Sequence, residues 1–212
     1  MTERNAWPSP ASIVSTRYQF LYVSVPKNAS STLRFEFQQE PYFGQELIYG
    51  KVPASQRDTL FTFTALRHPA TRLLSAYQEV SIRHDNQTDQ YPDFDFWQLP
   101  DQPERFDAFL ETLKEDKFDA HLWDQADYLR RIRRMDLYLR TESLEEDLAG
   151  LAARLGFKPP SGLPMRRSRQ SRIDKYQYDS YIIELSSLSS AQVRQIEDLY
   201  ADDMRLYESI RS

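Results

Sequence analysis

The chain has no cysteine, and it has only three histidines and five glycines among its 212 residues. Without cysteine it can form neither a disulfide framework nor a thiolate metal site. The three histidines, His68, His84 and His121, are too scattered to show the ligand spacing of a zinc site. We therefore expect no bound metal.

The chain also lacks an excess of positive charge and a long apolar run. Its formal net charge is -5, whereas a nucleic-acid surface needs a broad excess of Lys and Arg. No apolar stretch reaches the roughly 18 residues that cross a bilayer, and the N-terminal residues lack the basic-then-apolar layout of a secretory signal. We expect a cytoplasmic protein that binds no nucleic acid and spans no membrane.

What the chain does have is enough length and apolar content for one buried core. With 40% hydrophobic and 13% aromatic residues, it is typical of a soluble globular protein. We expect a single domain over residues 1–212, with a flexible N-terminus over 1–16.

Two strand-to-helix units are predicted in the first half of the chain. Residues 17–25, "RYQFLYVSV", and 59–66, "TLFTFTAL", are short, aromatic and β-branched, as buried strands are. Helical spacing of apolar residues follows each strand, after Pro26 and from Pro69. Because parallel neighbours need crossover connections, we expect an α/β fold with a central, mainly parallel sheet flanked by helices.

The second half of the chain carries further elements. Residues 85–103 are polar and aromatic with three prolines, which predicts a long surface loop of a kind that often carries function. A strand is predicted at 135–140. A helix should follow it, with a capping box formed by Ser143 and Glu146, and a last helix is predicted over 189–210.

The segment "PKNASSTLR", residues 26–34, joins the first strand to its helix and has the chemistry of an anion site. Backbone N–H groups and the helix dipole would point at an anion there. Lys27 would add a positive charge, and residues 30–32 would add hydroxyl donors. The glycine-framed nucleotide loop ending in Gly-Lys-Ser/Thr is absent, which disfavours an ordinary ATP or GTP site. A hydroxyl-rich helix cap beside an exposed lysine is the alternative.

A second segment, "RHPATRLLSAY", offers Arg67 at a strand end and Ser75 in the following helix. A guanidinium and a hydroxyl could bind one phosphate together, although an arginine bridging to a neighbouring acid is the alternative. Two such strand ends in one parallel sheet favour a ligand with two separated anionic groups.

The two segments, in this order, resemble the cofactor motifs of the sulfotransferases, most closely the carbohydrate (Golgi-type, chondroitin/dermatan-like) branch. The similarity covers roughly residues 17–208 and continues through "DAHLWDQADYLRRIRRMDLYLRTESLEEDL", "MRRSRQ" and "LYADDMRLYES". It implies the P-loop-like sulfotransferase fold and a donor, 3'-phosphoadenosine-5'-phosphosulfate (PAPS), which has two separated anionic ends. The implied reaction moves the sulfuryl group to a hydroxyl of a carbohydrate or small molecule and leaves 3',5'-ADP, without a metal.

The resemblance also assigns cofactor-binding residues. The 3'-phosphate site falls on Arg67 and Ser75. Ser31 stands where the family usually has threonine, and His68 where it usually has aspartate. "MRRSRQ" matches the segment that returns over the nucleotide. The remaining cofactor positions, in the phosphosulfate loop and in that returning segment, are Lys27, Asn28, Ala29, Ser30, Ser31 and Thr32, then Arg167, Ser168 and Arg169.

Two catalytic roles follow from the reaction. Lys27 is expected to stabilise the charge that develops on the leaving phosphate. The acceptor hydroxyl needs a base, for which His121 is the leading candidate and Glu79 and His84 are alternatives. His121 could instead be an ordinary packing or capping histidine. Some family members carry a catalytic histidine between the two cofactor motifs, and this chain has none between Lys27 and Arg67.

Several readings stay open at this point. The chain could be a cytoplasmic, bacterial enzyme in which the 85–103 loop shapes the acceptor site. It could also be a non-catalytic nucleotide- or glycan-binding module on the same fold. A nucleotide kinase is disfavoured by the missing glycine-lysine loop. Two arginine clusters, at 130–134 and 166–172, could be solvated surfaces or local anion sites.

Overall fold

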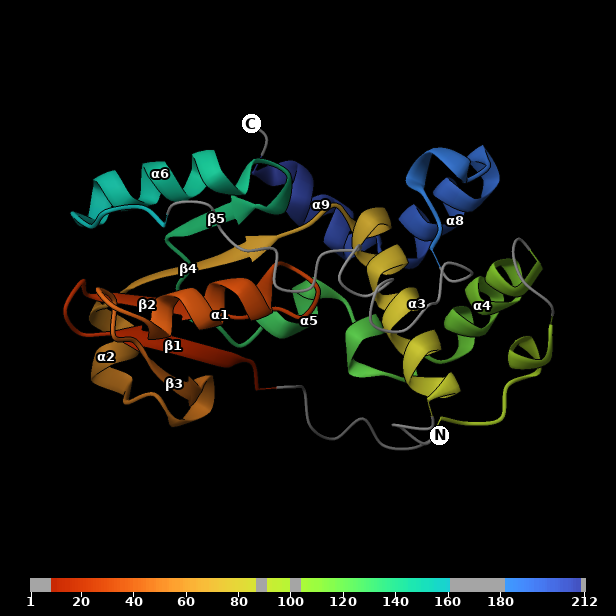
Figure 1. The fold of residues 1–212 in the computed structure, drawn as a ribbon, viewed down its shortest axis with the longest axis horizontal. Coiled ribbons are helices and arrows are strands. Elements are labelled where there is room, and N and C mark those ends of the chain that lie inside the picture. Colours follow the sequence, from red (N-terminus) through yellow and green to blue (C-terminus); the bar gives the residue numbers. More distant parts are fainter. Residues whose placement is uncertain (1–8, 87–90, 100–103, 161–181, 211–212) are drawn as a thin grey trace. The chain divides into compact units, whose positions relative to one another are not determined.

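The computed structural model describes residues 9–86, 91–99, 104–160 and 182–210, and Figure 1 shows the ribbon. These residues divide into two compact units. One unit runs to Arg67 and resumes at Gln125; the other runs from His68 to Asp124 and includes the C-terminal residues. The first unit contains the sheet, and the elements described in the second are helices.

The sheet has five strands within the described residues, in the order β3-β1-β2-β4-β5. Strands β2, β4 and β5 run parallel, whereas β1 pairs antiparallel with both β2 and β3. The predicted α/β fold is confirmed, with a mixed sheet whose centre is parallel. The strands are β1 (Ala11–Ser15), β2 (Phe20–Val23), β3 (Gln45–Ile48), β4 (Phe61–Leu66) and β5 (Leu137–Arg140).

Both faces of the sheet are covered by apolar side chains. On β2, Phe20 and Tyr22 point to one face and Leu21 and Val23 to the other, and all four are fully buried, as alternation along a strand requires. Helices α1 (Ser30–Gln38) and α6 (Leu144–Leu155) pack on the first face. The segment around α2 (Ala54–Thr59) and the one that follows α5 (Gln125–Leu129) supply residues to the second.

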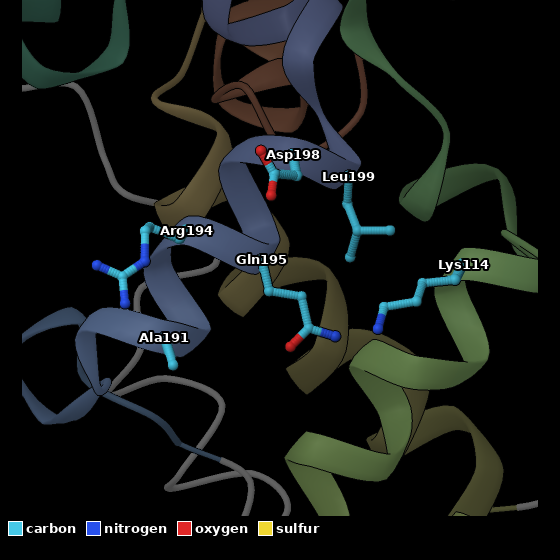
Figure 2. A pocket seen from close by; sticks show the side chains of 6 residues that line it. All are labelled: Lys114, Ala191, Arg194, Gln195, Asp198 and Leu199. Atoms are coloured by element: carbon cyan, nitrogen blue, oxygen red, sulfur yellow. The ribbon is translucent and has the colours of Figure 1, made fainter.

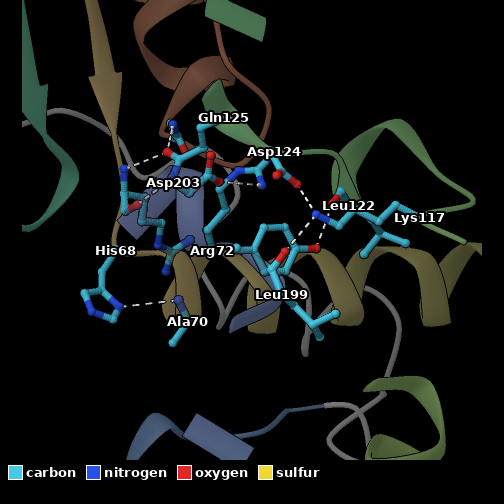
Figure 3. A network of polar contacts seen from close by, with 12 residues as sticks. His68, Ala70, Arg72, Lys117, Leu122, Asp124, Gln125, Leu199 and Asp203 are labelled. Atoms are coloured by element: carbon cyan, nitrogen blue, oxygen red, sulfur yellow. Dashed lines mark hydrogen bonds and ion pairs between the residues drawn. The ribbon is translucent and has the colours of Figure 1, made fainter. Parts of the chain in front are cut away.

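The second unit is built from helices α3 (Pro69–Asp85), α4 (Glu104–Glu115), α8 (Ser190–Leu199) and α9 (Ala201–Ser209). Its core gathers Tyr77 of α3, Phe109 of α4 and Ile196 of α8. Arg72 and Asp203 are also buried and form an ion pair with 4.0 Å between Nη1 and Oδ2, which ties α3 to α9 (Figure 3).

The N-terminal part of the sequence prediction needs correction. Residues 11–15, expected in a flexible N-terminus over 1–16, form strand β1. Both Ile13 and Val14 are buried, one on each face of the sheet, so this strand has no alternating pattern to identify it. The strand predicted at 17–25 is limited to Phe20–Val23, because the residues before it make the turn that reverses the chain after β1.

Three downstream predictions also change. The 85–103 loop contains a short 3-10 helix at Asp95–Gln98 in which Phe96 and Trp97 are buried in the core of the second unit. The Ser143 side chain makes no capping bond, because a 3-10 turn precedes α6, although Gly156 ends that helix with φ 73°. The last helix is interrupted at Tyr200, between α8 and α9.

Candidate cofactor site and general base

The loop between β2 and α1 adopts left-handed backbone conformations without glycine. Lys27 has φ 70° and Ala29 has φ 55°. For a residue with a Cβ atom, this conformation costs about 1–2 kcal/mol, and such strain persists where surrounding contacts impose it, often at functional sites. Two residues with a Cβ atom thus hold positive φ angles in a loop that contains no glycine.

Helix α1 begins without a side-chain cap. Its N-cap is Ala29, and its first turn contains no acidic residue. The hydroxyl residues Ser30, Ser31 and Thr32 follow the N-cap, so the alternative of a hydroxyl helix cap does not hold. An uncapped helix N-terminus favours an anion, and Lys27 beside it is half-buried.

Asn28 fixes this loop to the end of strand β4. Its side chain is completely buried, and Nδ2 donates to the carbonyl oxygen of Ala65 at 2.9 Å and to Oε1 of Gln125 at 2.5 Å. Because β2 and β4 are parallel neighbours, the residues after both strands lie at the same edge of the sheet.

Arg67 follows β4 directly and is held by Gln125, the first residue of α5. Gln125 is also completely buried. Its Nε2 donates to the Arg67 carbonyl at 2.9 Å, and its Oε1 accepts from the Arg67 N–H at 3.0 Å (Figure 3). The Arg67 guanidinium donates to the carbonyl of Lys27 at 3.4 Å. The structure therefore brings Lys27, Asn28 and Arg67 together, as their positions at two strand ends predicted.

The other expected cofactor residues are placed differently. Ser75 lies on α3, half-buried, between the core residues Leu73 and Tyr77. Arg167, Ser168 and Arg169, with the rest of the 166–172 arginine cluster, lie outside the described residues.

His121 is held by a carboxylate. The Asp119 Oδ1 accepts from the His121 backbone N–H at 2.7 Å and pairs with its Nδ1 at 2.6 Å, while Oδ2 accepts from the Tyr91 hydroxyl at 2.9 Å. Burial by itself would raise the pKa of Asp119, but the hydrogen bonds from His121 and Tyr91 lower it overall. An ionised Asp119 favours the tautomer with the proton on Nδ1, which leaves Nε2 to accept a proton.

The alternative bases have other partners. Glu79 forms an ion pair with Arg83 at 3.1 Å. His84 pairs with its neighbour Asp85 at 3.1 Å and stacks on Trp97, with ring centroids 4.0 Å apart. The carboxylate that contacts His121 is itself held by a further donor, the Tyr91 hydroxyl.

His68 has a structural role at the start of α3. It is the N-cap of α3, and its Nδ1 accepts from the Ala70 N–H at 3.3 Å. Aspartate is a preferred N-cap residue, so a histidine that presents a ring nitrogen as acceptor can stand in the position where the family usually has aspartate.

The first arginine cluster is largely neutralised. Arg130 pairs with Asp127 at 3.0 Å, and two further pairs join Arg133 to Asp58 at 3.6 Å and Arg134 to Asp136 at 2.6 Å. These contacts favour a solvated charged surface over an anion site.

A pocket of about 460 Å³ lies between α4 and α8 in the second unit (Figure 2). No predicted site residue lines it. Among the described residues, no cluster of three acidic or histidine side chains suits a metal, and no helix has the length and apolarity to cross a bilayer. The pocket is lined by Lys114, Ala191, Arg194, Gln195, Asp198 and Leu199.

The sequence did not predict three residues that hold the candidate cofactor site and the candidate base in place. Gln125 and Asp119 stand in the segment "DAHLWDQADYL", in which only His121 was predicted as a site residue. Asp119, two residues before His121, was a usable signal, because a carboxylate near a histidine often orients it. Gln125 and Tyr91 had no spacing that could have marked them.

Comparison with known families gives a match over most of the chain. A family model described as the sulfotransferase family matches residues 46–208. No curated protein and no solved structure gives a significant match. The matched range includes Arg67, Ser75, His121 and Gln125 and begins after the Lys27 loop.

Proposed function

Because this chain belongs to the sulfotransferase family, we propose that it moves a sulfuryl group from PAPS to a hydroxyl of a carbohydrate or small molecule. One observation carries the proposal: two segments suited to anions, the Lys27 loop after β2 and Arg67 after β4, are joined by one hydrogen-bond network. A ligand with a phosphosulfate at one end and a 3'-phosphate at the other suits such a pair.

The residues present fit the phosphosulfate end. The uncapped N-terminus of α1, the strained turn and Lys27 all favour an anion. We assign this end to residues 27–32 and the 3'-phosphate end to Arg67 and Ser75, with Arg167, Ser168 and Arg169 as further contacts. Bound PAPS would supply the activated sulfuryl group. Lys27 would then stabilise negative charge on the departing phosphate oxygen more strongly as that charge develops.

His121 is assigned the role of the base. With Nδ1 bonded to an ionised Asp119, its Nε2 can take the proton from the acceptor hydroxyl. The carbohydrate branch and a cytoplasmic location are further parts of the proposal, and they rest on the sequence motifs.

The donor site is tested by titration calorimetry with 3',5'-ADP. The wild type should bind, and Arg67→Ala should bind about 10- to 100-fold more weakly, since a charge-assisted contact to phosphate is lost. Arg133→Ala, an exposed arginine of the same unit, is the matched control and should bind like the wild type. A wild type that does not bind 3',5'-ADP contradicts the proposal.

Transfer is tested separately, with labelled PAPS and a panel of sugar, lipid-headgroup and small-alcohol acceptors. Lys27→Ala should lose most turnover on any working acceptor, whereas Lys51→Ala, an exposed lysine of the same unit, should keep it. Tight 3',5'-ADP binding with no transfer to any acceptor would favour the alternative, a non-catalytic binding module.

A further inference from the structure

Gln125 is a buried amide whose described hydrogen bonds all reach residues far away in the sequence. It is 0% exposed, and it contacts the side chain of Asn28 and both backbone groups of Arg67. Arg67 is 58 residues away and Asn28 is 97 residues away. A residue used only for packing would more often be apolar at such a position.

The orientation of this amide is fixed by groups that cannot exchange roles. The Arg67 N–H can only donate and the Arg67 carbonyl can only accept, so Oε1 of Gln125 must face the first and Nε2 the second. Asn28 must then present Nδ2 to Gln125, and the same Nδ2 also meets the carbonyl of Ala65. Each amide has one orientation that satisfies all of these contacts.

The contacts close into a ring that includes three residues of the proposed donor site, Lys27, Asn28 and Arg67. Asn28 is bonded to Gln125, Gln125 to the backbone of Arg67, and the Arg67 guanidinium to the carbonyl of Lys27, which precedes Asn28. The direction in which the Arg67 side chain leaves the backbone is thereby set relative to the Lys27 loop.

We propose that Gln125 is a positioning residue for the donor: by holding the Arg67 backbone it fixes where the Arg67 side chain lies relative to the Lys27 loop. This inference rests on the proposed function and adds a residue to it. Gln125 need not touch the nucleotide; it acts through the Arg67 backbone. Glutamate would fail in this place although it has the same shape, because its second oxygen would face the Arg67 carbonyl.

The test compares two ligands that share the 5' end, 3',5'-ADP and 5'-AMP. The dissociation constant of 5'-AMP divided by that of 3',5'-ADP reports the 3'-phosphate alone, because any loss at the 5' end affects both. Gln125→Glu should reduce this ratio at least about tenfold, toward the value in Arg67→Ala. In the Arg67→Ala background, Gln125→Glu should leave the ratio unchanged within about twofold, since both changes remove the same contact.

Controls separate positioning from stability. Gln45→Glu, an exposed glutamine on β3, should leave the ratio as in the wild type. Gln125→Ala is measured in parallel. Water can enter the space that the amide leaves and form hydrogen bonds to the Arg67 backbone, so this variant should fold. It should also lower the ratio of dissociation constants. Circular dichroism checks the folding of each variant.

The outcomes distinguish the two proposals. Suppose that the wild type binds 3',5'-ADP, and that folded Gln125 variants keep the wild-type ratio of dissociation constants and show only a lower melting temperature. The positioning role is then wrong, whereas the proposed donor site is not contradicted. If the wild type shows no preference for 3',5'-ADP over 5'-AMP, the donor assignment itself fails and the role of Gln125 fails with it.

Discussion

Asp119 has two functions for the residues around it. One oxygen caps the short turn that carries His121 and also fixes the His121 ring, and the other oxygen binds the Tyr91 hydroxyl. These donors lower the pKa of Asp119 against the effect of its burial. A carboxylate that stays ionised stabilises the positive charge that a neighbouring histidine gains when it accepts a proton. This arrangement supports the proposed roles of His121 as the general base and of Asp119 as the group that orients it.

Variants of this pair should separate turnover from donor binding. His121→Ala should lower kcat by about 10²- to 10⁴-fold because the base is lost. Asp119→Asn should lower it less, because the histidine remains but is poorly oriented. Both should keep the wild-type affinity for 3',5'-ADP, which is measured by calorimetry beside kinetics on a working acceptor.

His84→Ala is the matched control for that experiment. His84 is a histidine of the same unit that also pairs with an aspartate, and its loss should leave kcat nearly unchanged. A collapse of kcat in His84→Ala with normal turnover in His121→Ala would reverse the assignment.

The junction of β2, its loop and α1 carries backbone strain at the place proposed to bind an anion. Ala29 is the N-cap of α1 in a left-handed conformation, and the Asn28 side chain fixes the loop by donating to the Ala65 carbonyl. Alanine is among the poorest N-cap residues. The strand and the helix are each ordinary, and the strain is confined to the residues that join them.

Replacing Ala29 by glycine should raise the free energy of unfolding by up to about 1 kcal/mol, because glycine adopts this conformation without strain. Donor affinity should fall a few-fold, since the loop is less pre-organised. Urea unfolding and calorimetry measure the two effects. Ala149→Gly, on the exposed side of α6, should instead lose about 0.5–1 kcal/mol; an equal loss in Ala29→Gly would contradict the strain.

The sequence predicted the parallel part of the sheet well and the antiparallel part poorly. Strands β2 and β4 are rich in aromatic and β-branched residues, and both they and β5 lie within the ranges predicted for strands. β1 has apolar side chains on both faces, and β3 is a mostly exposed edge strand, so neither has a distinctive period. What defines these two strands is their pairing, which only the fold provides.

The residues of the candidate site also divide into those that a local pattern predicts and those that only the fold identifies. Lys27 and Arg67 could be predicted because Arg67 directly follows β4 and Lys27 lies four residues after the end of β2, and parallel strands place such residues at one edge. Gln125 could not, since its role depends on an amide from another part of the chain reaching both motifs. Local patterns identify groups that bind ligands, whereas the groups that hold them in place depend on tertiary contacts.

The whole chain is acidic, with a net charge of -5, yet the proposed donor is an anion. Charges farther away than the Debye length of about 8 Å at physiological salt are largely screened, so local donors determine binding. The helix N-terminus, Lys27 and Arg67 provide those donors within one sheet edge. A ligand that binds only the folded chain then stabilises it through mass action.

This linkage predicts a rise in melting temperature. At about 100 times its dissociation constant, 3',5'-ADP should add about 2.7 kcal/mol of stability, or roughly 5–11 °C for a chain of this size. At the same concentration, 5'-AMP should give a smaller shift, and Arg67→Ala should reduce the shift with 3',5'-ADP to the level seen with 5'-AMP. Differential scanning fluorimetry measures all of these. Equal shifts for the two nucleotides in the wild type would mean that the 3'-phosphate is not bound, because only that group distinguishes them.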